Sequence, residues 1–369
     1  MSQPLFVGQK IELFVEKLSF NGGRGVARES GVVLFVEGAA PQEKVLAEVT
    51  KLHKRFAEAR VLDVLEASPS RRVAPCPVYS LCGGCNLQHI DYPTQIAQKS
   101  MILAEQLRNL SRDYKFEVKP LVASDNEFFY RNRVQFHLAD GKVGFYKRGS
   151  HEIVDTAKCY LVEDDINAQL AQLRLGDLQK NQSPRLELRS ANSSGADFFS
   201  QVNSSQNLKL QTSISELVEN QNPPEFWDLY GGAGNFSLPI AKKNPGLKIV
   251  CVEGSREAVE FGKKLAKELD LTNITWINSS VEDFLKTQTA KTRLILIDPP
   301  RIGLTDVARK RLLPLLSRGS KLIYLSCNPS AFPRDAAELV KTGAVSLRWV
   351  QAYDLFPQTD HIEVLSFFD

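Results

Sequence analysis

The chain has 369 residues, of which 43% are hydrophobic, 24% charged and 9% aromatic. This composition is ordinary for a globular protein and argues against disorder, and the length predicts two or three compact units. No apolar run reaches membrane-spanning length and the first ten residues lack a signal-peptide core, so a cytoplasmic location without membrane contact is expected. The net charge of +3 does not by itself indicate a nucleic-acid partner.

Residues 1–68 contain short alternating segments, such as KIELFVEKL and GVVLFVEG, separated by glycine-containing turns. Five short strands at this spacing predict a small β-barrel of the oligonucleotide-binding type. Basic and aromatic residues of the kind that bind RNA lie close together at Lys51, Lys54, Arg55, Phe56 and Arg60. A barrel that only packs against its neighbour fits the pattern equally well.

Residues 69–204 form a second predicted region with mixed α and β character. Apolar spacing between Thr94 and Leu110 predicts an amphipathic helix with Pro93 at its start. Strand-like segments follow, and they are rich in basic residues, which favours contacts with RNA phosphates. These basic residues are Arg131, Arg133, Lys142, Lys147 and Arg148.

Four of the six cysteines fall in this second region, at Cys76, Cys82, Cys85 and Cys159. In a reducing compartment such cysteines indicate metal ligation more often than disulfides. Four thiolates can hold zinc or an iron–sulfur cluster, and spacing alone does not choose between them. The Gly83-Gly84 turn between two close cysteines argues against four unligated thiols.

From residue 205 to residue 369, strand-like and helix-like segments alternate. This alternation predicts an α/β domain with a doubly wound, Rossmann-like sheet, whose ligands bind where strands end and loops begin. Helices are expected at Asn235–Lys242 and Arg256–Glu268.

Three strand ends in this domain carry candidate ligand-binding groups. The first is the loop from Tyr230 to Asn235, which contains three glycines that would let the backbone approach a ligand. The second is Glu253, a carboxylate placed to bind ribose hydroxyls, as in dinucleotide-binding folds. The third is Asp298 in the motif Asp298-Pro299-Pro300-Arg301, which has no role in a dehydrogenase and therefore argues against that alternative.

Two further residues suggest covalent catalysis. Cys327 follows an apolar strand in the motif Ser326-Cys327-Asn328-Pro329, which favours a nucleophile at the sheet edge over a small core residue. Glu363 lies in the last strand between apolar neighbours, which favours a catalytic base over an exposed acid.

Taken in order, DLYGGAGNF, DPPR, YLSCNP and DLFPQTDHIEVLSFF resemble the RNA uridine-5-methyltransferase family. The resemblance covers nearly the whole chain, because residues 1–68 are similar to the TRAM domain of many members. It implies a catalytic domain of the Rossmann-like methyltransferase type and transfer of a methyl group from S-adenosylmethionine to uridine C5. It also implies that Cys327 adds to uracil C6 and that Glu363 removes the C5 proton before the cysteine leaves.

The resemblance implies further site residues. S-adenosylmethionine contacts carry over to Gln201, Tyr230, Asn235, Glu253 and Asp298. Phe199 resembles the aromatic residue that stacks on the flipped target base, although it could equally be a core residue. Arg131 is expected to contact RNA.

The resemblance also implies a [4Fe-4S] cluster on the four cysteines, with zinc as the alternative and with a structural or RNA-shaping role. The favoured substrate is 23S ribosomal RNA, with transfer RNA second, and the protein is expected to be a monomer. The rival functions are cytosine-5 methylation and a noncatalytic RNA-binding factor that keeps an inactive methyltransferase fold.

Overall fold

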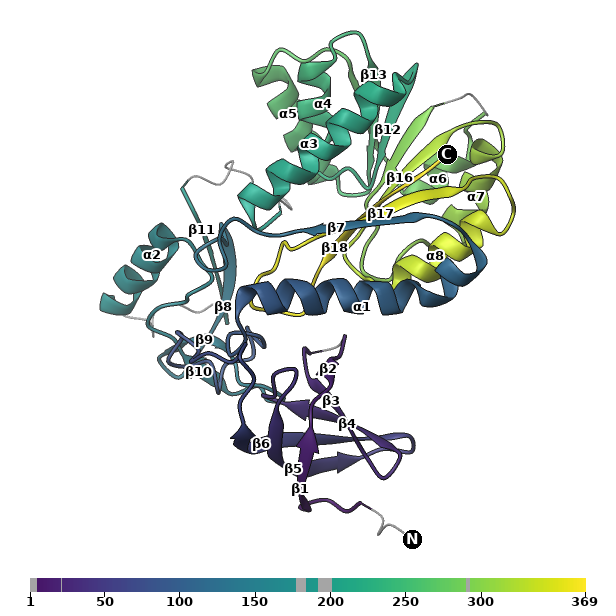
Figure 1. The fold of residues 1–369 in the computed structure, drawn as a ribbon. Helices are drawn as coiled ribbons and strands as arrows, with labels where there is room; N and C mark the ends of the chain where they lie inside the picture. Colours follow the sequence, from purple (N-terminus) through teal and green to yellow (C-terminus); the bar gives the residue numbers. More distant parts are fainter. Residues whose placement is uncertain (1–4, 21, 177–183, 192–200, 290–292) are drawn as a thin grey trace. The chain divides into compact units, whose positions relative to one another are not determined.

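The computed structural model describes residues 5–20, 22–176, 184–191, 201–289 and 293–369. The chain forms two compact units, and both are assembled from separate stretches of sequence (Figure 1). Unit 1 contains residues 1–102, 126–190 and 356–360, and unit 2 contains residues 103–125, 191–355 and 361–369. Within the described residues, no helix has both the length and the apolar character needed to cross a membrane.

Unit 1 begins with a six-stranded barrel sheet, ordered β1-β5-β6-β4-β3-β2. Side chains alternate along its strands, so that Val45, Ala47 and Val49 of β5 are buried while their neighbours are more exposed. The predicted barrel is confirmed, and the segment KIELFVEKL supplies two of its strands. The strands are β1 (Lys10–Phe14), β2 (Lys17–Leu18), β3 (Gly25–Glu29), β4 (Val32–Glu37), β5 (Lys44–Leu52) and β6 (Phe56–Glu66).

The rest of unit 1 contains a four-stranded antiparallel sheet, ordered β10-β9-β8-β11. Alternate residues Val134, Phe136 and Leu138 of β8 are buried together with Ile166 and Leu170 from helix α2. The elements are β8 (Arg133–Ala139), β9 (Lys142–Tyr146), β10 (Ile153–Asp155), α2 (Asp164–Leu175) and β11 (Arg185–Arg189).

Helix α1 (Tyr92–Asp113) is the amphipathic helix predicted between Thr94 and Leu110. Pro93 lies in its first turn, where the missing N–H group leaves no intrahelical bond unmade. Residues up to Ile102 belong to unit 1, and the remainder of the helix buries Leu103, Leu107 and Leu110 in the core of unit 2.

Unit 2 is built on an eight-stranded sheet, ordered β14-β13-β12-β15-β16-β18-β17-β7. Every neighbouring pair is parallel except the two pairs that involve β18. This topology confirms the Rossmann-like prediction, and β7 adds an edge strand that the sequence pattern did not indicate. The strands are β7 (Glu117–Val122), β12 (Glu225–Leu229), β13 (Lys248–Glu253), β14 (Ile274–Asn278), β15 (Leu294–Ile297), β16 (Lys321–Ser326), β17 (Leu347–Tyr353) and β18 (Glu363–Phe368).

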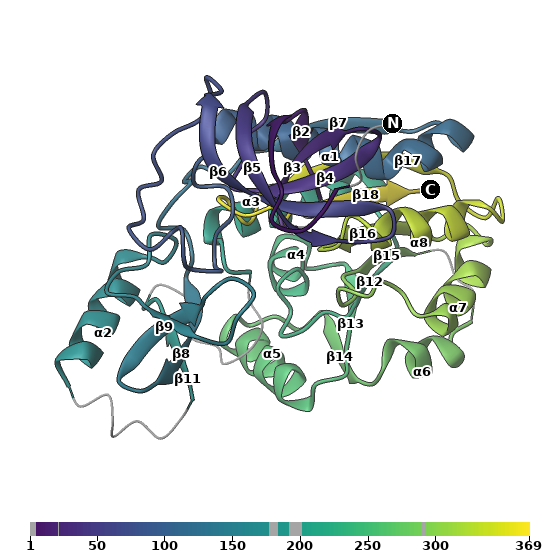
Figure 2. The ribbon, with the colours of Figure 1, turned by 90° about the horizontal axis from the view of Figure 1, so that it is seen from below.

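Six helices of unit 2 cover the two faces of this sheet, with α3, α4 and α5 on one face and α6, α7 and α8 on the other (Figures 1 and 2). Helix α5 spans the residues that the sequence predicts, because the side-chain oxygen of Ser255 caps its N-terminus by accepting a hydrogen bond from the Ala258 N–H at 3.2 Å. The helices are α3 (Ser204–Gln221), α4 (Ser237–Lys243), α5 (Arg256–Glu268), α6 (Val281–Lys286), α7 (Asp306–Leu316) and α8 (Ala331–Val340).

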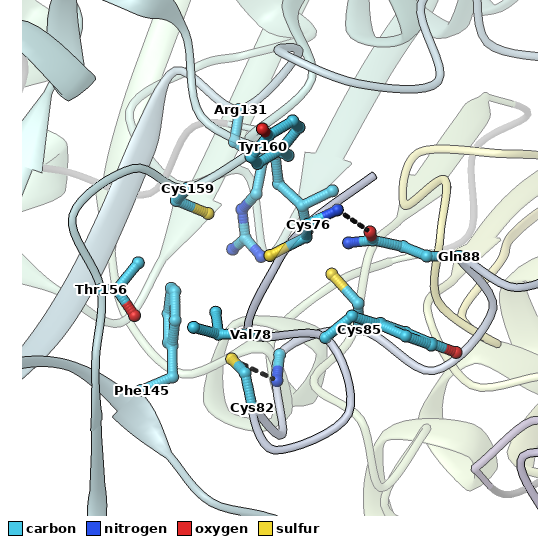
Figure 3. Close-up of a pocket in the computed structure, with 13 residues that line it drawn as sticks. Cys76, Val78, Cys82, Cys85, Gln88, Arg131, Phe145, Thr156, Cys159 and Tyr160 are labelled. Atoms are coloured by element: carbon cyan, nitrogen blue, oxygen red, sulfur yellow. Dashed lines mark hydrogen bonds between the residues drawn. The ribbon is translucent and has the colours of Figure 1, made fainter. Parts of the chain in front are cut away.

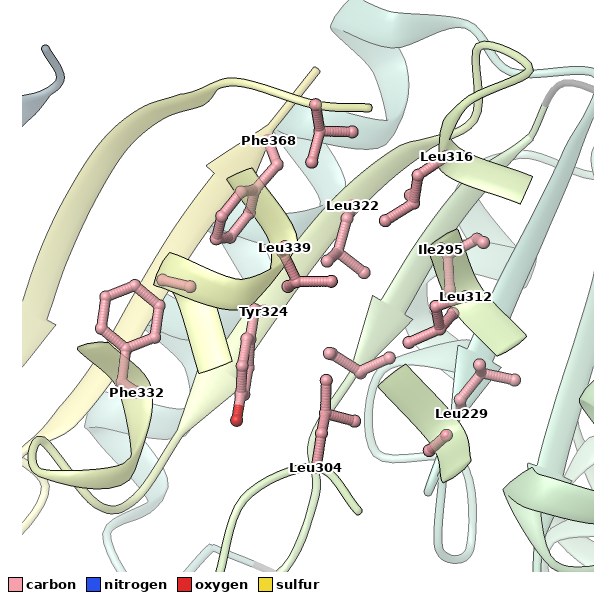
Figure 4. Close-up of a cluster of buried hydrophobic side chains, with 14 of the residues drawn as sticks. Leu229, Ile295, Leu304, Leu312, Leu316, Leu322, Tyr324, Phe332, Leu339 and Phe368 are labelled. Atoms are coloured by element: carbon pink, nitrogen blue, oxygen red, sulfur yellow. The ribbon is translucent and has the colours of Figure 1, made fainter. Parts of the chain in front are cut away.

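The main core of unit 2 lies between the sheet and helices α7 and α8 (Figure 4). Leu322 and Tyr324 of β16 are fully buried beside Leu312 of α7 and Phe332 of α8. Burying each such side chain stabilises the fold by about 1.5–3 kcal/mol. The core thereby fixes the positions of the central strands, and these strands position the loops at their carboxyl ends.

Candidate active site

The candidate catalytic residues of unit 2 lie at one edge of the sheet. Asp298 follows β15 and Cys327 follows β16, and both strands are parallel. Strand β18 is antiparallel to β16, with Ser326 opposite Val364, so its first residue Glu363 lies at the same edge as Cys327. The topology therefore brings together Cys327 and Glu363, the candidate nucleophile and candidate base, which are 36 positions apart in the sequence.

The glycine-containing loop after β12 has the conformation expected of a ligand-binding turn. Tyr230 and Gly232 both have left-handed backbone, with φ of 64° and 57°. A Cβ atom on Gly231 would lie only 2.5 Å from the Cys251 sulfur, so the backbone can pass there only with glycine. The left-handed Tyr230 is a strained residue of the kind that concentrates at functional sites.

Glu253, at the end of β13, receives two backbone hydrogen bonds. The N–H of Gly232 donates to Oε2 at 3.0 Å and the N–H of Ser255 donates to Oε1 at 2.7 Å. The carboxylate thus lies beside the glycine-containing loop, at the position from which nucleotide-binding folds contact a ribose.

Two other expected cofactor residues, Gln201 and Asn235, lie near the N-terminal end of α3. Asn235 pairs with Asn207 of α3 through reciprocal side-chain hydrogen bonds of 2.9 Å, and its backbone carbonyl accepts from Gln211 at 2.8 Å. Gln201 is buried just before Asn203, which caps α3. Phe199 lies outside the described residues.

Two carboxyl groups near the site hold their protons more strongly than usual. The pKa of Asp298 is raised to about 7 by burial and by the nearby Asp228 carboxylate. The pKa of Asp228, at the base of the glycine-containing loop, is raised to about 6, mainly by burial. The Ser237 hydroxyl donates to Asp228 Oδ2 at 2.6 Å, while Oδ1 has no hydrogen-bond partner among the described residues. Asp228 is a candidate site residue that sequence reasoning missed, because it lies within the apolar strand β12 and not in the loop after it.

Cys327 is partly buried, and its surroundings favour the protonated, neutral thiol. Burial, followed by the negative charges of Glu363 and Asp298, raises its pKa to about 11, whereas Arg301 acts in the opposite direction. Glu363, Asp298 and Arg301 are therefore close enough to Cys327 for their charges to act on it. A thiol of this kind requires a base or a neighbouring cation before it can attack.

Glu363 is buried, with 3% of its surface exposed. Burial and the neighbouring Asp298 raise its pKa well above the ordinary value of 4.5, and Arg301 opposes this shift. Within the described residues its Oε2 atom accepts no hydrogen bond. A carboxyl group of this kind is suited to exchange a proton with a bound molecule.

Arg301 is another candidate site residue, because its charge acts on Cys327 and Glu363, and sequence reasoning assigned it no role although it stands in the motif that contains Asp298. Its backbone carbonyl accepts a hydrogen bond of 2.9 Å from the side chain of Asn328, the residue after Cys327. Nearby, the buried Asp335 accepts from the Leu304 N–H at 2.8 Å. The loops after β15 and β16 are therefore tied together.

The four cysteines singled out in the sequence line one cavity in unit 1 (Figure 3). Cys76, Cys82 and Cys85 come from one loop, and Cys159 precedes α2. Their sulfur atoms face a common space of about 40 Å³, which is roughly the room needed by a few water-sized groups. The structure therefore brings the whole predicted ligand set together.

Arg131 also lines this cavity, and its Nε atom is buried with no hydrogen-bond partner among the described residues. Burial raises the pKa of Cys85 to about 12 and that of Cys159 to about 11. In the part of the chain that the structure describes, no three His, Cys, Asp or Glu side chains have the geometry of a metal-ion site. The predicted contact of Arg131 with RNA stays a prediction.

Comparison with known proteins finds family models and relatives that match this chain. The family model described as tRNA (Uracil-5-)-methyltransferase matches residues 186–368, and the TRAM domain model matches residues 4–62. An uncharacterized RNA methyltransferase of Bdellovibrio bacteriovorus is 37% identical over 98% of this chain and 95% of its own length. The 23S rRNA (uracil(1939)-C(5))-methyltransferase RlmD of Acidithiobacillus ferrooxidans is 28% identical over 100% of this chain and 99% of its own.

A solved structure has a similar fold. The tRNA (uracil-54, C5)-methyltransferase of Pyrococcus abyssi, in complex with S-adenosyl-L-homocysteine, matches with a TM-score of 0.75. The match covers 97% of this chain and 100% of that chain, at 21% identity. The fold is therefore shared over almost the entire length.

Proposed function

The chain belongs to the RNA uridine-5-methyltransferase family, and we propose that it methylates uridine C5 in RNA through a covalent adduct with Cys327. The observation that carries this mechanism is the placement of Cys327 and Glu363 at facing ends of the paired strands β16 and β18. The glycine-containing loop and Glu253 open onto the same edge of the sheet.

The reaction begins when the thiol of Cys327 gives its proton to water and the resulting thiolate sulfur bonds to uracil C6. The electrons of the C5–C6 double bond move toward the ring carbonyl, so that C5 becomes a nucleophile. After C5 has taken the methyl group, Glu363 removes the C5 proton. The C5–C6 double bond re-forms and the bond to the Cys327 sulfur breaks.

Charge at the site supports these roles. The cation of Arg301 favours the thiolate form of Cys327, whereas the protonated form of Asp298, with a pKa of about 7, would not oppose it. The raised pKa of Glu363 makes it a stronger base than an exposed glutamate once it is ionised.

S-adenosylmethionine, when bound, supplies an electrophilic methyl group. The loop backbone at Gly232 faces open space, and Glu253 is placed to accept hydrogen bonds from a ribose. Asp298 and Tyr230 are proposed to contact the cofactor at the same edge of the sheet. Gln201 and Asn235 are proposed to contribute on the side of α3, with Asn235 fixed by Asn207.

Ribosomal RNA of the large subunit is the proposed substrate, because the RlmD relative that matches the full chain carries that name. Transfer RNA is the second candidate, because the structural match of similar length acts on it. The cytoplasmic location and the monomeric state stay predictions.

The function is tested with the full chain, S-adenosylmethionine and unmodified transcripts of 23S rRNA and tRNA. Nucleosides released from each RNA are identified by mass spectrometry. We expect 5-methyluridine in the rRNA and none in the tRNA. Formation of 5-methylcytidine would contradict the uridine assignment, and the absence of any methylated nucleoside from cofactor-bound protein would favour a noncatalytic binder.

The four-cysteine cavity is proposed to hold a [4Fe-4S] cluster. Its residues fit, since four sulfurs face one space and Arg131, whose Nε has no hydrogen-bond partner among the described residues, would supply positive charge to the anionic cluster. Zinc is the alternative metal for four thiolates, and metal analysis of the purified protein distinguishes the two. Methyl transfer needs no electron, so the proposed role is structural.

Protein purified without oxygen is therefore expected to be brown and to contain iron and inorganic sulfide in equal amounts. Cys85→Ser should lose both, since it removes one cluster ligand. Cys251→Ser is the matched control, because Cys251 lies in unit 2 beyond the cavity, and it should retain both. Stoichiometric zinc with little iron would contradict the cluster.

A further inference from the structure

The loop that follows β15 in unit 2, residues 298–304, carries both Asp298 and Arg301 and is here called the proline loop. Its middle is open to solvent, with 69% of the Ile302 surface exposed, whereas Leu304 at its end is buried. Among the described residues, the guanidinium of Arg301 makes no hydrogen bond or ion pair. The place of this cation relative to Cys327 therefore depends on the backbone of the proline loop.

A buried carboxylate on α8 accepts four hydrogen bonds, two on each oxygen. Asp335 is fully buried, and its Oδ2 accepts from the Leu304 N–H and from the Tyr324 hydroxyl, both at 2.8 Å. Its Oδ1 accepts from Arg309 Nη1 and from Arg334 Nε, both at 3.0 Å. The charge of this carboxylate is thus compensated by two arginines, as a buried ion requires. Asp335 thereby joins the proline loop, β16 and α7 to its own helix.

Arg334, the neighbour of Asp335 on α8, fixes a second group of the proline loop. Its Nη2 donates to the Ile302 carbonyl at 2.8 Å, so the two residues hold the backbone on both sides of Gly303. Gly303 is left-handed, with φ of 80°, and a Cβ atom there would clash with Asp335 Oδ2 and lie 2.7 Å from Arg334 Nη2. The loop backbone therefore lies directly against this ion pair, at a distance that only glycine permits.

The turn that contains the candidate nucleophile is fixed to the same helix. Asn328, which follows Cys327, donates from its side chain to the Arg301 carbonyl at 2.9 Å. Its own backbone carbonyl accepts from the N–H groups of Ala331 and Phe332 at 3.0 and 3.1 Å, in the first turn of α8. Because the turn and the proline loop are both bonded to α8, this helix sets the spacing between Arg301 and Cys327.

We propose that Asp335 and Arg334 are positioning residues for the covalent attack, because they hold the proline loop so that the cation of Arg301 stays close to the Cys327 sulfur. Neither residue touches the reacting atoms. The attraction between two charges falls with distance, so a proline loop released from α8 would stabilise the thiolate less. This inference rests on the proposed role of Cys327 as the nucleophile.

The direction of the charge effect agrees with this role. Burial raises the pKa of Cys327, the negative charges of Glu363 and Asp298 add to the rise, and Arg301 acts against it. Arg301 is thus the cation whose distance from the sulfur changes the fraction of reactive thiolate.

The test measures how readily the Cys327 thiol reacts in the full chain without RNA. Well below the pKa of a thiol, its rate of alkylation by iodoacetamide at a fixed pH is proportional to the thiolate fraction. Mass spectrometry of the peptide that contains Cys327 separates this rate from those of the other cysteines. Arg334→Ala is the main variant, because the Arg334 side chain is 55% exposed and its loss leaves the core packed.

At about pH 8.5, Arg334→Ala and Arg301→Ala should each slow the alkylation of Cys327 by about threefold to tenfold, the effect of weakening one neighbouring charge by up to about one pKa unit. The double variant should be no slower than Arg301→Ala alone, because Arg334 acts through Arg301. Arg334→Lys keeps a charge and a donor and should recover part of the rate.

Asp335→Asn replaces the carboxylate with an amide of the same shape and should slow alkylation to the same extent. Thermal unfolding shows whether this buried variant folds, and the Arg334 variants decide the question if it does not. The matched control is Lys341→Ala, since Lys341 is a basic residue at the other end of α8, where its ammonium lies 3.9 Å from Glu338. The control should alkylate at the normal rate.

Normal alkylation of Cys327 in Arg334→Ala would overturn the inference. A further loss in the double variant would overturn it as well, because Arg334 would then act independently of Arg301. With 5-fluorouridine-containing RNA and S-adenosylmethionine, adduct formation by Arg334→Ala should slow by the same factor as alkylation. If the unsubstituted protein forms no adduct, the proposed function fails instead, while the alkylation rates still decide whether Arg334 and Asp335 control the reactivity of Cys327.

Discussion

Cys327→Ala is expected to abolish the covalent complex that forms between the protein and 5-fluorouridine-containing RNA in the presence of S-adenosylmethionine. Fluorine at C5 cannot be removed as a proton, so the covalent bond between the Cys327 sulfur of the unsubstituted protein and the base would persist. The complex would then survive denaturing electrophoresis. Because the nucleophile is absent from the variant, 5-methyluridine formation on ordinary RNA should fall by at least about 10³-fold.

The matched control for this experiment is Ser330→Ala. Ser330 lies in the turn that follows Cys327 and makes a side-chain contact with Gln106 at 3.4 Å, so its loss tests local structure alone. The control should still give the complex. A complex that persists in Cys327→Ala would show that another group attacks the ring, and the mechanism would be wrong.

Glu363→Gln is expected to accumulate methylated covalent adduct on ordinary RNA, because the sulfur attack and methyl transfer precede the step that needs the base. Release of product should slow by about 10²- to 10⁴-fold, the usual contribution of a general base. Mass spectrometry of the trapped protein–RNA complex measures both the adduct and its methyl group. Loss of adduct formation itself would assign Glu363 an earlier role.

The same residue determines how release depends on pH. Glu363 acts as a base only when ionised, and burial raises its pKa well above 4.5. The release rate of the normal protein should therefore rise with pH across that elevated pKa and fall as the pH drops below it. Glu363→Gln should lose this rise, whereas Glu338→Gln, an exposed glutamate on α8, should retain it.

The positions of the candidate catalytic residues could be predicted because strand ends in a doubly wound sheet converge on one edge. Glu253, Asp298 and Cys327 each directly end or follow an apolar run, which is a strong local signal. The pairing of Glu363 with this edge depends on β18 being antiparallel, and alternation alone does not reveal strand direction. The apolar neighbours of Glu363 favour a catalytic base, and the resemblance to a family adds which proton this base would remove.

Other features could not be predicted from the residues. Residues 356–360, between β17 and β18, form an irregular segment held by hydrogen bonds to its carbonyl groups. Any residue provides a carbonyl, so the sequence carries no pattern for this segment. Arg131 reads as one basic residue among several, and only the structure places it in the wall of the cysteine cavity. β7 is a short apolar-polar segment whose place depends on a partner that lies more than 200 positions later, in β17.

The edge strand β7 determines how this chain can be cut into separately expressed fragments. A fragment that begins at residue 205 would contain seven of the eight strands and would leave β17 at the edge with unpaired N–H and C=O groups. Such an exposed edge can pair with another chain and so promotes aggregation. Such a fragment must therefore also include residues 117–122, although strands β8 to β11 of unit 1 lie between them and residue 205 in the sequence. Gene fusion or domain exchange at a single cut point is therefore a poor route for this catalytic sheet, and two coordinated cuts are needed.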